Sequence, residues 1–107
     1  MNDQTPTATQ PTITVSEYRI NALPIEARVA DWWHWDAYAR LNRAGRWVVT
    51  DHHVFYDAAG GRHFSAREAG DHDEADAIAL AKRVAATMVL NGETAAQAAA
   101  RVLGASS

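Results

Sequence analysis

The chain reads Arg46-Trp47-Val48-Val49-Thr50-Asp51-His52-His53-Val54-Phe55-Tyr56, then Asp57-Ala58-Ala59-Gly60-Gly61, then Arg62-His63-Phe64-Ser65. Aromatic and β-branched residues dominate the first part, and such side chains suit the pleated surface of a β-strand. The middle part opens with Asp and closes with Gly, which favours a tight turn containing a residue at positive φ. The stretch therefore predicts a β-hairpin over residues 46–65.

The turn chemistry also predicts the register of this hairpin. If Gly60 lies in the left-handed region after a type I turn, Tyr56 pairs with Arg62 and Phe55 pairs with His63. A slip of one residue would move every side chain to the other face of the strand. The register therefore decides which polar side chains of the hairpin can meet.

Composition limits the class of protein. A chain of 107 residues is long enough for one domain with a modest core. The sequence has no cysteine, which excludes a disulfide scaffold, thiol catalysis and a cysteine zinc site and is compatible with the cytoplasm. The net charge of −3 argues against a basic nucleic-acid-binding face. No run of about 18 apolar residues predicts a membrane span, so we expect a cytoplasmic protein without membrane contact.

The N-terminal residues differ in composition from the rest. Residues 1–12 are rich in Thr, Gln and Pro, so they cannot bury enough apolar surface to offset the entropy of ordering. We expect 1–12 to be a flexible tail and 13–107 to form a single α+β domain. Alternating apolar residues predict a strand over 13–20, which ends before Pro24 because proline donates no ladder hydrogen bond.

Three helices are expected around the hairpin. Residues 25–43 place Val29, Trp33, Ala37 and Leu41 at i, i+4 spacing, which is typical of a buried helical stripe. Acidic capping residues open a helix over 74–91, and a capping box of Thr94 with Gln97 opens a short one over 95–103. The expected fold is α+β: a small antiparallel sheet with the 46–65 hairpin at its centre, covered by the 25–43 and 74–91 helices.

Aromatic residues suggest an interface. A helix over 25–43 would carry Trp32, Trp33, Trp35 and Tyr38 over more than half of its circumference, so they cannot all face one sheet. Trp33 aligns with the buried stripe. Trp32, Trp35 and Tyr38 are therefore the candidate interface residues, because exposed aromatic side chains are favoured as binding anchors. The alternative is that the N-terminal strand or the last helix covers them.

Metal binding is the main chemical alternative. In the expected register Asp51, His53 and His63 share one face of the hairpin, and a carboxylate with two imidazoles can bind zinc. Their spacing matches no established zinc signature, and ordinary half-exposed strand histidines are the favoured interpretation. The acids of residues 71–76 are explained by helix capping. We therefore expect no metal and no other cofactor.

The function expected from the sequence is binding rather than catalysis. No nucleophile–base pair, phosphate loop or pair of catalytic carboxylates can be defended. We expect a non-enzymatic protein that binds a protein partner or forms a homodimer, and such a protein could act as an inhibitor. One alternative is a nucleic-acid-associated accessory protein, which requires Arg19, Arg46, Arg62 and Arg67 to gather on one face. The other is a small metal-dependent hydrolase using Asp51, His53 and His63.

Overall fold

The computed structural model describes residues 11–28 and 35–105, and it confirms an α+β fold with an antiparallel sheet. The strands are β1 (Glu17–Asn21), β2 (Asp36–Leu41), β3 (Trp47–Thr50), β4 (Phe55–Tyr56) and β5 (Arg62–His63). The helices are the 3₁₀-helix η2 (Ile25–Ala27), α1 (Ala66–Ala69), α2 (Glu74–Thr87) and α3 (Ala95–Ala105). Each strand pairs with the next one in the sequence, so the sheet has the order β1-β2-β3-β4-β5.

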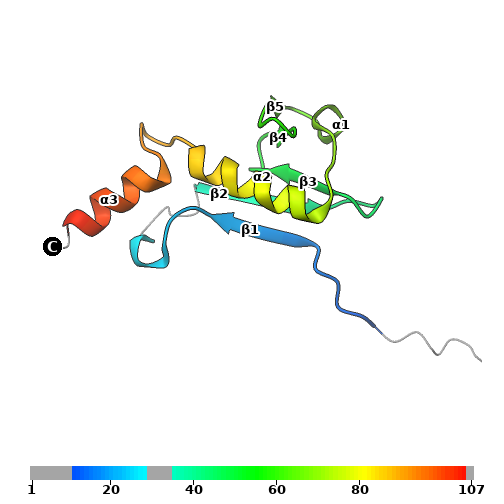
Figure 1. The fold of residues 1–107 in the computed structure, drawn as a ribbon, viewed down its shortest axis with the longest axis horizontal. Helices are drawn as coiled ribbons and strands as arrows, with labels where there is room; N and C mark the ends of the chain where they lie inside the picture. The colour runs from blue at the N-terminus through cyan, green and yellow to red at the C-terminus, as the bar shows by residue number, and fades with distance from the viewer. Residues whose placement is uncertain (1–10, 29–34, 106–107) are drawn as a thin grey trace, which may run out of the picture.

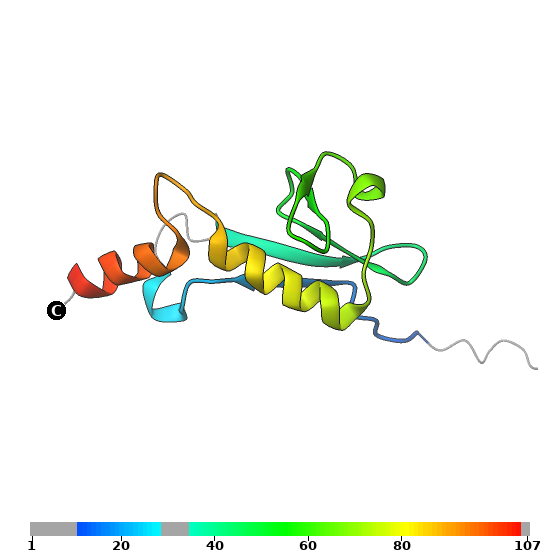
Figure 2. The same ribbon diagram turned by 45° about the horizontal axis from the view of Figure 1, so that its top comes forward.

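The main core lies between the sheet and α2, which lies over β1, β2 and β3 (Figures 1 and 2). Its members are mostly small or aromatic side chains on one face of the sheet and one stripe of the helix: Ala37, Ala39, Trp47, Val49, Val54, Tyr56, Ala77, Leu80, Ala81, Val84 and Ala85. Alternation explains the sheet side, because every second residue of β2 and β3 points toward α2. This helix therefore anchors the three longest strands.

A second, smaller core lies beyond one end of the sheet. It is formed where η2 and α3 pack together, and its buried members are Leu23, Ala27, Trp35, Ala95 and Ala98. Only Ala22 and Met88 among the described residues pack against both cores. In both views α3 and the segment before β1 leave the body at opposite ends.

The predicted helix over 25–43 is wrong. Within that range the structure has η2 at Ile25–Ala27 and the central strand β2 at Asp36–Leu41, while residues 29–34 lie outside the described residues. The physical reason is an ambiguous period. Ala37 and Leu41 fit i, i+4 spacing, but with Ala39 they also fit the alternation of a strand, and the buried Ala37 and Ala39 face α2.

The predicted hairpin is confirmed at its turn and corrected at its first arm. Tyr56 pairs with Arg62 and Phe55 with His63, and Gly60 has a φ of 87°. The arm expected to be one strand is broken instead into β3 and β4, which pair with each other across a second turn at residues 51–54. The central unit is therefore a three-stranded meander.

The remaining elements differ from expectation mainly at their ends. The first strand starts at Glu17 instead of residue 13, and α2 stops at Thr87 instead of 91 because Met88 is extended, with a ψ of 137°. The capping box of Thr94 and Gln97 is confirmed, and α3 runs to Ala105. Within 11–28 and 35–105, no helix is long and apolar enough to cross a membrane.

Candidate functional site

A cleft of about 820 Å³ opens on the described surface. It lies where the C-terminal end of α2, the turn at residues 51–54 and the β4–β5 hairpin meet. Polar residues from the turn and the hairpin and apolar residues from the end of α2 line it: Tyr38, Asp51, His52, His53, Tyr56, Gly60, Arg62, Val84, Thr87, Met88, Val89 and Leu90. A concave site with apolar walls and a few polar groups is the usual form of a binding site.

The turn at residues 51–54 is held by side-chain hydrogen bonds to its own backbone. The Thr50 hydroxyl donates to the Val54 carbonyl at 2.7 Å and accepts from the His52 N–H at 3.0 Å. The Asp51 Oδ1 accepts from the His53 and Val54 N–H groups at 2.8 and 3.0 Å. Asp and Thr favour turns because their oxygens replace ladder partners in this way. This chemistry ends β3 after Thr50.

His52 is held in an unusual backbone conformation at the edge of the cleft. Its φ is 81°, and a non-glycine residue in this region carries local strain that its surroundings must offset. The imidazole lies against the Tyr38 ring with centroids 4.1 Å apart, and its Nδ1 is 3.3 Å from the Arg40 Nη2. Strained residues of this kind cluster at binding sites, so the turn is the part of the cleft that points to function.

Tyr38 connects the cleft to a polar network on the face of the sheet opposite α2. Its hydroxyl donates to Asp36 at 3.2 Å, and burial followed by the Asp36 charge raises the pKa of Tyr38. Asp36 is buried and also accepts from Arg19 and from Asn21, each at 2.5 Å. A buried carboxylate needs such donors to offset its desolvation. The hydrogen bond to Asp36 fixes the hydroxyl of Tyr38, and the contact with His52 fixes its ring.

Tyr56 and Asp51 form the polar floor of the cleft. The phenol donates to Asp51 Oδ2 at 2.9 Å, and burial together with this hydrogen bond raises the pKa of Tyr56 to about 12. Burial alone would raise the pKa of Asp51, but the hydrogen bonds from Val54, His53 and Tyr56 outweigh it and lower that pKa. At neutral pH the pair is a neutral phenol and a carboxylate, so neither group is poised to exchange protons.

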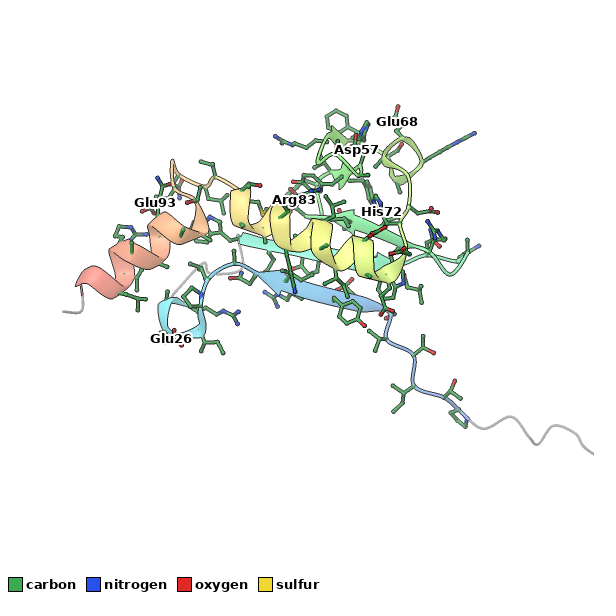
Figure 3. All side chains as sticks on the ribbon, in the orientation of Figure 1. Glu26, Asp57, Glu68, His72, Arg83 and Glu93 are labelled. Carbon is green, nitrogen blue, oxygen red and sulfur yellow. The ribbon has the colours of Figure 1, made fainter. Side chains whose placement is uncertain are left out.

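The β4–β5 turn is closed around Asp57. Its Oδ1 accepts from the Ala59 and Gly61 N–H groups at 2.9 and 2.8 Å, and its Oδ2 lies 2.7 Å from His63 Nε2. A Cβ at Gly61 would lie 2.7 Å from the same carboxylate, which explains the second glycine. In Figure 3, Arg83 of α2 lies beneath this turn, where it donates to the Ala58 carbonyl at 3.1 Å.

Acidification is expected to loosen this turn. The hydrogen bond from His63 and those from Gly61 and Ala59 lower the pKa of Asp57 below its ordinary value. Because the folded-state pKa is depressed, the carboxylate stabilises the fold above the ordinary pKa, and this contribution is lost as the pH falls through the folded-state pKa. The difference in melting temperature between wild type and Asp57→Asn should shrink from about pH 5 to about pH 3. A difference that stays constant over this range would contradict the assignment.

The apolar lining of the cleft comes from the last turn of α2 and the residues that follow it. Val84 is buried in the main core, Met88 and Leu90 are partly exposed, and the Val89 side chain is 62 % exposed. A tight turn follows, in which Leu90 and Glu93 exchange backbone hydrogen bonds at 2.8 and 2.9 Å. Met88, Val89 and Leu90 together give the cleft an accessible apolar lining, which could bind an apolar group.

The structure separates the residues expected to form an interface. Trp35 is buried in the second core, where its Nε1 donates to the Glu93 carbonyl at 3.3 Å. Tyr38 is half-buried and lines the cleft. Trp32 lies outside the described residues. Of the three candidates, Tyr38 is the one that the structure places in the candidate site.

The three candidate metal ligands are not brought together. The break after β3 removes the shared face expected for them, Asp51 is committed to its own turn and to Tyr56, and His63 contacts Asp57. Across 11–28 and 35–105, no three His, Cys, Asp or Glu side chains are grouped so as to hold a metal ion. His53 lines the cleft as an exposed side chain.

Sequence reasoning missed the apolar half of the site. The expected helix over 74–91 includes Met88 and Val89, whereas α2 ends at Thr87 and both residues line the cleft. The Asp51–His52–His53 run did contain a signal, because Asp can accept hydrogen bonds from the backbone N–H groups two and three residues further on and so end a strand. A scan of family models, a search of curated proteins and a search of solved structures each found no match to this chain.

Proposed function

We propose that this protein is a small, non-enzymatic cytoplasmic binding domain that seats a segment of another protein in the cleft. One observation carries this proposal: exposed or partly exposed apolar residues that follow α2 line the same cleft as polar residues of the turn and the hairpin. A segment of a protein chain can contact both the apolar and the polar lining, because it carries apolar side chains on a polar backbone. Such a site binds through one apolar anchor and is oriented by a few polar contacts.

Each wall has a defined part in this proposal. The partner's apolar side chain contacts Met88, Val89 and Leu90, which together form the apolar wall. Its backbone or polar side chains contact His53 and Arg62, whose side chains are exposed in the polar lining of the cleft. An inhibitor of a larger protein would be one form of this function, and a second copy of this chain is another possible source of the segment.

Catalysis and nucleic-acid binding are less well supported. The raised pKa of Tyr56 keeps its phenol protonated at neutral pH, and the Asp51 carboxylate is occupied by the hydrogen bond from this phenol. Among the described lining residues, this pair therefore does not provide a nucleophile beside a free base. Arg19 lies on β1 and Arg62 on β5, at opposite edges of the sheet. Arg19 and Arg46 are also paired with aspartates. This distribution does not favour a phosphate-binding stripe.

Replacing Val89 by aspartate should reduce binding of cleft-directed peptides at least about tenfold, or roughly 1.4 kcal/mol. The reason is that a charge is placed where the apolar anchor would lie, while the exposed side chain contributes little to folding. The matched control is Leu103→Asp, which makes the same kind of change on an exposed position of α3. Peptides selected from a displayed library on the wild-type protein supply the ligands, and titration calorimetry measures affinity.

Chemical-shift mapping decides where such peptides bind. The proposal expects the largest shifts at the cleft residues His53, Arg62 and Val89. Peptides that bind both aspartate variants with wild-type affinity, or that perturb another face, would show that the cleft is not the binding surface.

A further inference from the structure

We infer that residues 12–16 form an antiparallel β-ribbon with the same residues of a second copy of this chain, which joins the two molecules next to β1. This segment lies apart from the cleft, on the outer side of the sheet, and the inference does not depend on the proposed function. It rests on the exposure of the segment, on the direction of its backbone groups and on its self-complementary sequence.

Residues 12–16, which precede β1, are rich in strand-forming side chains and are all exposed. The segment consists of Thr, Ile, Thr, Val and Ser, and β-branched residues are the ones most enriched in strands. Ile13 is completely exposed and Val15 is 50 % exposed. No other described element runs along it in either view (Figures 1 and 2). Proteins usually cover or interrupt an apolar strand of this kind, because it is a template for pairing.

The end of the β1–β2 ladder shows which way the backbone groups of the segment point. The Leu41 N–H donates to the Ser16 carbonyl at 2.8 Å, and β2 ends at Leu41. Backbone groups of successive strand residues point to alternate sides. In the inferred ribbon residues 12–16 continue the strand, so that, with the Ser16 carbonyl pointing toward β2, the backbone groups of Val15 and Ile13 point to the outer edge. That edge can therefore accept another strand.

The sequence of the segment fits a copy of itself. No charged residue occurs from Gln4 to Ser16, so two identical segments can approach without like-charge repulsion. With the two-fold axis at Thr14, Ile13 of one copy lies opposite Val15 of the other, and both side chains are apolar. Pro11 ends the ladder, because proline donates no hydrogen bond.

The register centred on Val15 is less favourable. Moving the axis to Val15 would place Ile13 opposite the Glu17 carboxylate of the second copy, an apolar side chain against a charge. A ribbon of five residues per copy buries much less surface than the roughly 800 Å² per partner of a stable interface. The dimer is therefore weak and concentration-dependent. The occupant to which the inference commits is a second copy, and the register is the one centred on Thr14.

Single cysteines test this register in the full chain, which has none of its own. In the inferred ribbon the two Thr14 residues face each other as a non-hydrogen-bonded pair, with Cα atoms about 4.5 Å apart. This distance lies within the roughly 4.4–6.8 Å range that a disulfide spans. Thr14→Cys should therefore form a disulfide-linked dimer in a glutathione redox buffer. The matched control Thr12→Cys faces Ser16 of the other copy and should cross-link at least about tenfold more slowly. Equal cross-linking rates would overturn the register.

Proline substitutions test the same ribbon without a covalent bond. Val15→Pro removes a ladder donor on the outer edge and should abolish the dimer in sedimentation experiments, whereas Thr14→Pro loses an N–H that points to the other edge and should preserve it. Both changes lie outside the sheet, and circular dichroism checks that the fold is unchanged. A wild-type protein that sediments as a monomer at every concentration, or a Val15→Pro variant that dimerises normally, would overturn the inference. Neither result bears on the cleft.

Discussion

Replacing Trp35 by alanine is expected to lower the free energy of unfolding by about 3–5 kcal/mol, without changing the oligomeric state. The indole is 9 % exposed and fills the second core between η2 and α3. Its removal leaves a cavity lined by Leu23, Ala27 and Ala98, and small side chains cannot move far enough to close it. The Glu93 carbonyl also loses the hydrogen bond from the ring.

Trp35→Phe is the matched variant for this prediction. It keeps most of the apolar volume and loses the indole N–H, so the expected destabilisation is smaller, about 1–2 kcal/mol. Urea denaturation followed by circular dichroism measures both, and sedimentation measures association. If Trp35→Ala unfolds like the wild type and instead loses self-association, Trp35 belongs to an interface and the burial described here has no energetic role.

Replacing Ala81 by leucine is expected to destabilise the protein by about 3 kcal/mol, because it overfills the core instead of leaving a cavity. Ala77, Ala81 and Ala85 are completely buried along one stripe of α2, and they face Ala37 and Ala39 of β2, which are also completely buried. Alanine on both sides allows the helix to lie close to the sheet. Three additional carbon atoms at Ala81 have no space and must push the two layers apart.

The control for this variant is Ala79→Leu, because Ala79 is exposed on the same helix. Leucine and alanine have similar helix propensities, so this change should alter stability by less than about 0.5 kcal/mol. Thermal unfolding of the two variants compares them directly. Equal melting temperatures would show that α2 is not closely packed against β2.

The sequence predicted what local chemistry controls. The register of the β4–β5 hairpin follows from the Asp57 turn and from Gly60, and the start of α3 follows from the Thr94 capping box. These features depend on residues close together in the chain, so the same bonds form whatever surrounds them. The α+β class could be predicted for the same reason.

The errors occur where tertiary packing decides between two local readings. Residues 36–41 fit both a helix and a strand, and pairing with β1 and β3 selects the strand. Without that strand, Trp35 could not be placed under α3. The cleft was missed for a related reason, since it depends on where the hairpin sits relative to the end of α2. A local signal for it came from Asp51, whose side chain can end a strand.

The contact of Met88 with both cores links the docking of α3 to binding in the cleft. Met88 packs against both cores, and Met88 and Leu90 also line the cleft. A ligand that contacts these side chains in their packed arrangement binds the state with α3 docked better than a state in which α3 has detached. By linkage, occupancy of the cleft must then strengthen the docking of α3 by the same factor by which docking strengthens binding. If the cleft binds the proposed segment, its occupancy and the docking of α3 are therefore coupled through Met88.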